Sequence, residues 1–212
     1  MSRSERLLER HAEAIAAAMS RPLLVAMTDG TVPPSVFARY LALEEGFVVT
    51  AGHLVALLLE SGPDAESRPH LERALQDLRG EQREYFDAAT GRGGPREPSR
   101  DAPRDALSGY ALALVARHGG AAVPVCFAAA ETLYAAWCTR AVMMPVARPD
   151  AVQRWIDLHA TASFAEGAAM WRSMVDRLPP RLIDDALLDA WFSGMLAAEN
   201  VFHDAAYEGG TE

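Results

Sequence analysis

The spacing of apolar residues is the feature that most constrains the fold. Apolar side chains recur at intervals of three and four over long segments, and short breaks containing Pro or Gly separate these segments. The sequence contains no run of alternating apolar and polar residues bounded by hairpin turns. The pattern therefore predicts an all-α fold. The expected helices lie near residues 3–19, 20–29, 34–61, 66–90, 102–117, 120–143, 149–164, 164–178 and 182–207.

Prolines and glycines mark several of the expected ends. Gly30 is typical of a residue that follows a helix, and Pro34 is typical of a first helical turn. The segment 90–104, TGRGGPREPSRDAPR, has the composition of a loop or linker. Neither half of the chain obviously closes a core alone, so we expect residues 1–212 to form one domain with a flexible loop at about 90–104.

The amino-acid composition of the chain argues against some classes of binding partner. The chain has 212 residues, of which 50% are hydrophobic and 23% charged, as is usual for a globular protein with a substantial core. Its formal net charge of -9 argues against nucleic-acid binding, which normally requires clustered Lys and Arg. We therefore expect no nucleic-acid partner.

Location is predicted from the cysteines and the apolar runs. Cys126 and Cys138 lie in an apolar segment, so they are expected to be buried free thiols in a reducing compartment, which favours the cytoplasm. The first residues mix charges with apolar side chains and predict a helix rather than a secretory signal. The longest uncharged apolar run, 46–59, is shorter than the roughly 20 residues that a membrane span needs. No membrane partner is expected.

A first candidate acid occurs in the segment 34–61. Helical spacing places Glu44 and Phe47 on a common apolar face. In a functional interpretation, Glu44 is a pocket acid that accepts hydrogen bonds from a ligand amine. In a structural interpretation, Glu44 or Glu45 lies at the edge of the core and pairs with an arginine, such as Arg39 or one on a neighbouring helix.

A second candidate acid interrupts the otherwise uncharged centre of segment 120–143. Glu131 stands three residues before Tyr134 and six before Trp137. A buried glutamate needs a partner, so Glu131 is expected to be hydrogen-bonded, metal-bound or facing a cavity. A purely structural role, such as a bond to a buried tyrosine or tryptophan, remains open.

A third candidate acid lies in the last predicted helix. Glu199 follows the uncharged stretch 190–198 and therefore approaches an apolar interior. Desolvation there would raise the proton affinity of its carboxyl group, which suits a general acid or base. In the alternative interpretation, His203 and Asp204 are solvated and Glu199 only ends the buried face.

Other reactive centres are less well supported. Helical di-iron proteins use Glu-x-x-His ligands, and this spacing occurs at none of the candidate acids, so neither a metal nor another cofactor is predicted. Cys126 has no visible activating base and is expected to be an inert buried thiol.

Three segments resemble the thiaminase-II (TenA) family. They are GTVPPSVFARYLALEEGFV, WIDLHATASF and AAENVFHDAAY, and the likeness extends in order over nearly the whole chain. The resemblance implies a helical fold like that of haem oxygenase and a homo-oligomer, either a dimer or a tetramer. It also implies hydrolysis of thiamin breakdown products, in which an amine is displaced from an aminopyrimidine.

The resemblance also suggests roles for individual residues. Glu44 falls where the family has the acid that holds the aminopyrimidine, and Glu199 matches the acid of the terminal helix. Phe47 and His159 stand where tyrosines are usual. The expected catalytic residues are Glu199 and Glu131, and the expected substrate-binding residues are Glu44, Phe47, Tyr110, Tyr134, His159 and Phe202.

The chain departs from the best-known branch of the family at the nucleophile. That branch has a cysteine four residues before the position of Tyr134, where this chain has Ala130. Glu131 instead resembles the cysteine-less branch, for which hydrolysis of an aminopyrimidine amine or formamide is expected. We therefore predict a metal-free hydrolase of a small heteroaromatic compound. The alternatives are an enzyme recruited to a specialised biosynthetic step, such as a rearrangement or cofactorless oxidation, and a non-catalytic binding protein.

Overall fold

The computed structural model describes residues 1–90 and 105–208, and every regular element within these ranges is helical. The all-α prediction is confirmed. The loop predicted at about 90–104 lies outside the described residues, apart from Thr90 at the end of a helix. The elements are α1 (Arg3–Arg10), α2 (Ala12–Ala18), α3 (Pro22–Thr28), α4 (Pro34–Glu60), α5 (Ser67–Arg79), α6 (Glu81–Thr90), α7 (Ala106–His118), the 3₁₀ turn η1 (Gly119–Ala122), α8 (Val123–Val142), α9 (Asp150–His159), α10 (Ala162–Arg177) and α11 (Asp185–Glu208).

The structure corrects two predicted helices. The segments expected to be continuous over 3–19 and 66–90 are each divided, at His11 and at Gly80. The His11 ring bonds to Asp189 of α11 at 2.9 Å, so a tertiary contact accompanies the first break. Glycine has a low helix propensity, which accounts for the second. Amphipathic spacing continues across both breaks, and this is why periodicity alone did not reveal them.

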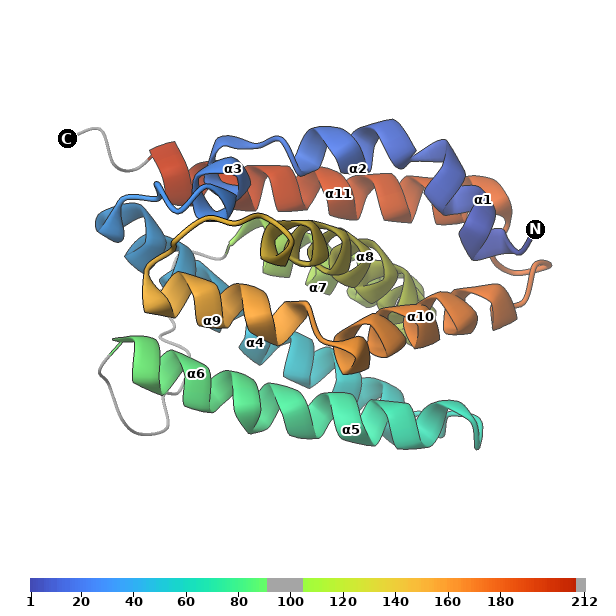
Figure 1. The fold of residues 1–212 in the computed structure, drawn as a ribbon. Helices are drawn as coiled ribbons and strands as arrows, with labels where there is room; N and C mark the ends of the chain where they lie inside the picture. The colour runs from blue at the N-terminus through green and yellow to red at the C-terminus, as the bar shows by residue number, and fades with distance from the viewer. Residues whose placement is uncertain (91–104, 209–212) are drawn as a thin grey trace.

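Helix α8 lies at the centre of the bundle and contacts α9, α10 and α11 (Figure 1). Its residues from Val123 to Ala130 are all buried, and their mostly small side chains let neighbouring helices approach closely. Helices α5 and α6 run along one edge of the bundle, and α11 with α1 and α2 runs along the opposite edge (Figure 1). The long helices α4, α8 and α11 thus bring the candidate acids Glu44, Glu131 and Glu199 towards one interior.

Two stretches of the described chain, Pro34–Glu60 and Ala106–Val142, are long and apolar enough to cross a membrane by length and composition alone. This is weak evidence for a span, because both stretches contribute core helices of the bundle. Tyr40 and Val55 of α4, for example, are fully buried.

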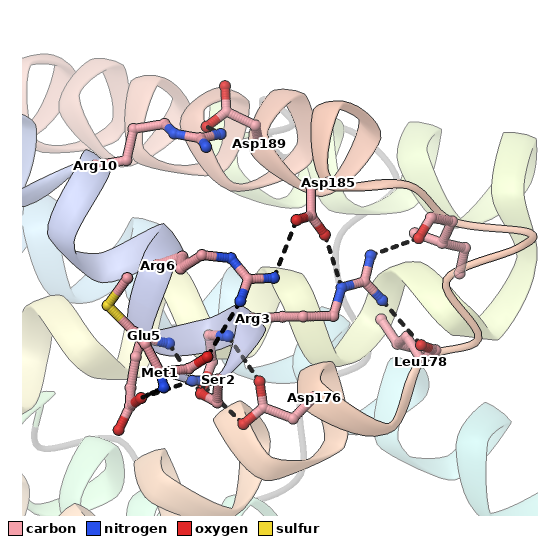
Figure 2. A network of polar contacts seen from close by, with 12 residues as sticks. Met1, Ser2, Arg3, Glu5, Arg6, Arg10, Asp176, Leu178, Asp185 and Asp189 are labelled. Atoms are coloured by element: carbon pink, nitrogen blue, oxygen red, sulfur yellow. Dashed lines mark hydrogen bonds and ion pairs between the residues drawn. The ribbon is translucent and has the colours of Figure 1, made fainter.

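The first helix is joined to the last third of the chain by a polar network (Figure 2). Arg3 donates to Asp185 Oδ1 at 2.8 Å and to the carbonyl oxygens of Leu178 and Ile183 at 2.9 and 2.5 Å. Asp176 accepts from the Ser4 backbone N–H at 2.7 Å and from the Ser4 hydroxyl at 2.9 Å. These contacts fix α1 against α10 and α11.

Candidate functional site

A small cavity, here called the inner pocket, lies between α4 and α8 and is bordered by α9 and α10. Its volume is about 50 Å³. Predicted site residues from separate parts of the sequence meet in its wall, so the fold brings most of the expected site together. The lining residues are Glu44, Phe47, Val48, Ala51, Leu78, Gln82, Phe127, Ala130, Glu131, Tyr134, His159 and Phe164.

A chain of hydrogen bonds runs into the wall of the inner pocket at Glu44. The Tyr134 hydroxyl lies 2.9 Å from Glu44 Oε2 and 2.9 Å from the Tyr40 hydroxyl. When Glu44 is ionised, Tyr134 donates its single proton to that carboxylate, so Tyr40 must donate to Tyr134. Glu44 is buried rather than at the edge of the core, and its described partner is Tyr134, while the Arg39 guanidinium donates to the carbonyl oxygen of Ala206.

Burial dominates the electrostatics of Glu44. Desolvation raises its pKa to about 7, against the opposing effect of the hydrogen bond from Tyr134. Near neutral pH this carboxyl group therefore exists in both protonation states. It can accept a hydrogen bond from an amine in one state and donate one to a ring nitrogen in the other.

Glu131 lies where the inner pocket meets a larger cavity. Its Oε1 accepts a 2.8 Å hydrogen bond from the Trp171 indole N–H. Burial raises the pKa of Glu131 to about 8, although the bond from Trp171 opposes this shift. The expected bond to a buried tryptophan is present, and the carboxyl group also faces a cavity.

The larger cavity, here called the outer chamber, has a volume of about 510 Å³ and lies between α5 and α10. Its lining includes Glu131, His159, Phe127 and Phe164, which also line the inner pocket. Residues that the sequence analysis did not select complete it. They are Glu66, Pro69, His70, Arg73, Ala74, Asp77, Leu78, Glu81, Gln82, Leu158, Thr161, Ser163, Glu166, Gly167, Met170 and Trp171.

His159 borders both cavities as a neutral imidazole. Its Nδ1 lies 2.8 Å from the Trp155 carbonyl oxygen, which can only accept, so Nδ1 carries the proton and Nε2 remains an acceptor. Burial lowers the pKa of His159 to about 4 despite that hydrogen bond. A bound molecule therefore meets an uncharged acceptor at this position.

Glu199 is completely buried but lines neither cavity. Its Oε2 lies 3.7 Å from Nε2 of His203, which is equally buried. Burial raises the pKa of Glu199 well above its usual value, and the nearby Glu44 carboxylate adds to the shift. The interpretation in which His203 is solvated is wrong. Asp204, half-buried, pairs with Arg21.

Two predicted binding residues do not line the cavities. Phe202 is buried and packs edge-on against Tyr40, with ring centroids 6.0 Å apart. Tyr110 lies on α7, and its hydroxyl donates to the Trp191 carbonyl oxygen at 3.2 Å. A Cβ on Gly194 would overlap the Tyr110 ring, so the absence of a side chain at Gly194 makes this packing possible.

The thiols and possible metal ligands do not form a second reactive centre within the described residues. Cys126 and Cys138 are buried and unpaired, as predicted, and burial raises the pKa of Cys126 to about 12. A thiolate is therefore disfavoured at neutral pH. Ala130 lines the inner pocket in place of the cysteine that the resemblance would supply. Residues 1–90 and 105–208 contain no group of three or more His, Cys, Asp or Glu side chains placed to hold a metal ion.

No protein-family model and no curated protein sequence matches the chain. Solved structures with a similar fold were found. A TenA homologue from Pyrococcus horikoshii OT3 matches with a TM-score of 0.80 at 14% identity, over 99% of this chain and 100% of that one. A TenA homologue from Pyrococcus furiosus matches with a TM-score of 0.81 at 17% identity, over 97% and 100%.

A further neighbour carries a different functional name. A protein from Silicibacter sp. TM1040, named a TenA family transcription regulator, matches with a TM-score of 0.76 at 13% identity, over 98% of this chain and 96% of that one. Such low identities relate the folds and do not transfer an activity. The chain therefore has the all-α fold of the TenA homologues.

Proposed function

We propose that the protein is a metal-free hydrolase that releases an amine or formamide from an aminopyrimidine or a similar heteroaromatic compound. The observation that carries this proposal is the Glu44 carboxyl group, which is buried at the inner pocket and bonded to Tyr134. A carboxyl group with a pKa of about 7 matches the adjacent donors and acceptors of an aminopyrimidine. Phe47 and Phe127 line the same pocket and supply apolar contacts for a ring.

Glu131 is the group proposed to activate water. It faces both cavities, and a pKa of about 8 places its ionisation near the working pH, where general-base catalysis is most effective. The ionised carboxylate takes a proton from water as the oxygen attacks the carbon that carries the amine. The C–O bond then forms and the C–N bond breaks.

Glu199 is proposed to supply the proton that the leaving amine requires. Burial raises its pKa well above the usual value and so favours the protonated form. Because Glu199 lines neither cavity, the proton must pass through another group. Tyr40 and Tyr134 both interact electrostatically with Glu199, and Tyr134 is also bonded to Glu44 in the pocket wall. Neither Glu199 oxygen has a described hydrogen-bond partner, so a proton passes from Glu199 to these hydroxyls only when a water molecule or a side-chain movement bridges the gap.

The test is an assay of purified protein with aminomethyl-aminopyrimidine and its formyl derivative, with thiamin as a further candidate. We expect release of the amine or formamide, unchanged by a chelator, and a loss of at least about 100-fold in kcat for Glu131→Gln. Glu72→Gln, an exposed acid of α5, is the matched control. Unchanged substrates at high enzyme concentration would refute the hydrolase.

A second candidate function is a specialised biosynthetic step, such as a rearrangement. The observation that favours it is His159, whose neutral imidazole borders both cavities where the resemblance leads to a tyrosine. Such an imidazole can accept a proton from a substrate carbon or hydroxyl. The two functions are separated by the product, because only hydrolysis incorporates oxygen from labelled water.

A homo-oligomer, a cytoplasmic location and a single domain over 1–212 are further parts of the proposal. Sedimentation of the purified protein would distinguish a monomer from the expected dimer or tetramer.

A further inference from the structure

A third cavity, here called the rear cavity, adjoins the inner pocket. It has a volume of about 210 Å³ and lies between α4 and the junction of α5 with α6. Its lining includes Val48, Gly52, Leu78 and Phe86. A Cβ added to Gly52 would meet no atom within 4 Å, so there is open space on this face of α4. The inner pocket is thus bordered by two larger cavities, the outer chamber and the rear cavity.

Two side chains separate the inner pocket from the rear cavity. Val48 of α4 and Leu78 of α5 are the described residues that line both. Val48 is buried, and Leu78 is half-buried and packs against the core. This boundary, here called the partition, therefore consists of one apolar side chain from each helix.

The boundary between the inner pocket and the outer chamber is broader. The described residues that line both are Leu78, Gln82, Phe127, Glu131, His159 and Phe164. Leu78 is therefore the described residue that borders all three cavities. Its apolar side chain offers no hydrogen bond, so it affects a ligand through the space that it fills. Shortening it would join the inner pocket to the rear cavity.

The inner pocket has the size of one small ring. Its volume is about 50 Å³, and one water needs roughly 10–15 Å³ of such space, so it has room for about four waters. Each water takes up roughly 30 Å³ in the liquid, and four waters therefore correspond to about 120 Å³ of molecular volume. This is on the order of the volume of one six-membered heteroaromatic ring. A second, fused ring needs space that a neighbouring cavity must supply.

Glu44 determines which way such a second ring would extend. Val48 lies one helical turn beyond Glu44 on the same face of α4, and both residues line the inner pocket. A ring bonded to Glu44 through its amine therefore lies beside Val48. A second ring fused next to the amine-bearing carbon extends towards the partition, where Leu78 fills the space.

We propose that Leu78 is a specificity-determining residue, which limits the inner pocket to single-ring heteroaromatic amines by closing it to the rear cavity. The inference rests on the proposed function for the amine held by Glu44, but it concerns the fit of the ring and not its hydrolysis. It narrows the substrate class to monocyclic amines. With a small residue at position 78, the joined cavities would admit a fused two-ring amine, and Phe86 would supply an apolar contact for its second ring.

The test compares two compounds by isothermal titration calorimetry. They are 4-aminopyrimidine and 4-aminoquinazoline, in which a benzene ring is fused next to the amine-bearing carbon. The wild-type protein should bind the monocyclic compound more tightly. Leu78→Ala should shift the ratio of the two affinities by at least about ten-fold in favour of the fused compound, because a pocket discriminates by such a factor even for one methylene. An unchanged ratio would overturn the proposal.

Matched variants separate the partition from a general loosening of the fold. Leu75→Ala shortens another half-buried leucine of α5, which lines none of the three cavities, and it should leave the ratio unchanged. Leu78→Met nearly conserves the volume and should keep the preference for the monocyclic compound. A shift of equal size in Leu75→Ala would refute the role of Leu78.

Val48→Ala provides an independent test from the opposite side of the partition. It should shift the ratio in the same direction as Leu78→Ala, and it carries the test if Leu78→Ala does not fold. Binding is measured without turnover. A shifted ratio in a protein that releases no amine would refute the hydrolase alone, whereas release of the amine with an unchanged ratio would refute this inference alone. Failure of every variant to bind either compound would refute both.

Discussion

The Glu199 carboxyl group and the His203 imidazole are neighbours in the core, and burial shifts the pKa of each towards its uncharged form. Oε2 and Nε2 lie 3.7 Å apart, and neither side chain is exposed to solvent. Burial raises the pKa of Glu199, whereas burial and the Arg21 guanidinium lower that of His203 to about 3. An ion pair here would bury two charges with no further described hydrogen bonds to compensate them. Burial therefore favours a neutral pair, with the proton on Glu199.

Glu199→Gln tests that protonation state. Because burial favours the neutral form of the native carboxyl group, the neutral amide should change the free energy of unfolding at pH 7 by less than about 1 kcal/mol. The amide cannot give up a proton, so kcat should fall by at least about 100-fold. Denaturant unfolding and steady-state kinetics measure the two effects. A large loss of stability with retained turnover would contradict both assignments.

Stability should fall as the pH rises from about 6.5 to about 8. The folded protein holds protons on Glu44 and Glu131, with pKa values of about 7 and 8, whereas a glutamate in the unfolded chain, with an ordinary pKa of 4.5, has lost its proton in this range. Each proton that only the folded protein holds lowers the free energy of unfolding by at most about 1.4 kcal/mol for every unit by which the pH rises. The buried histidines, with pKa values of about 3 to 4, have the opposite effect on stability, but only below a pH of about 6.5, the ordinary pKa of histidine.

Thermal unfolding at several pH values checks this expectation. Glu131→Gln should flatten the decline between pH 6.5 and 8, while Glu72→Gln should leave it unchanged. A stability that rises through this window would show that the two glutamates are ionised in the folded protein.

Tyr134→Phe should destabilise the protein more than the removal of an isolated hydroxyl. It leaves Glu44 Oε2 without its donor and the Tyr40 hydroxyl without its described acceptor, and each unsatisfied buried group costs about 1–3 kcal/mol. Tyr85→Phe is the control, because it removes one bond to the Ala151 carbonyl oxygen. Equal losses from the two variants in urea would argue against the Tyr40, Tyr134 and Glu44 chain.

Gly194→Ala should cost about 1–3 kcal/mol, because the added methyl group overlaps the Tyr110 ring. Gly52→Ala is a matched change in α4, where a Cβ meets nothing within 4 Å, and it should instead stabilise by about 0.5–1 kcal/mol. Urea unfolding of both variants measures the difference. If both stabilise, Tyr110 does not pack where it is described.

Arg3→Ala should destabilise the protein by about 1–3 kcal/mol. The guanidinium is largely buried and satisfies Asp185 and two carbonyl oxygens, which the substitution leaves without that donor (Figure 2). Arg10→Ala removes an exposed pair with Asp189 and should cost less than about 1 kcal/mol. Similar losses of stability for both variants in thermal unfolding would show that the buried contacts of Arg3 stabilise the fold no more than the exposed ion pair of Arg10 does.

The fold was predictable because the spacing of apolar residues within each long helix indicates which face the helix buries. Helix α4, for example, was expected over 34–61 and spans Pro34–Glu60. The divisions at His11 and Gly80 were missed, since the apolar spacing continues through them. The burial of Glu44 and Glu199 was suggested by their apolar surroundings, and the structure places both side chains in the core.

The outer chamber could not be predicted in this way. His70 and Trp171 meet only because α5 packs against α10, and no local pattern records a contact between residues so distant in sequence. Tyr110 was assigned from the family resemblance, and the loop predicted at about 90–104 makes that correspondence loose. Its contact with Gly194 depends on the position of α11 and has no signal near Tyr110 itself.

The network around Arg3 also bears on the order in which the chain can fold during synthesis. Arg3 is made early, whereas its partner Asp185 follows 182 residues later. At about 5–20 residues per second, α1 must wait roughly ten seconds or more for this contact. Until then its apolar residues, including the buried Leu7, remain accessible to chaperones. Docking of the first helix is thus a late step, and a ribosome stalled before α11 would present a nascent chain whose N-terminal helix still lacks its partner.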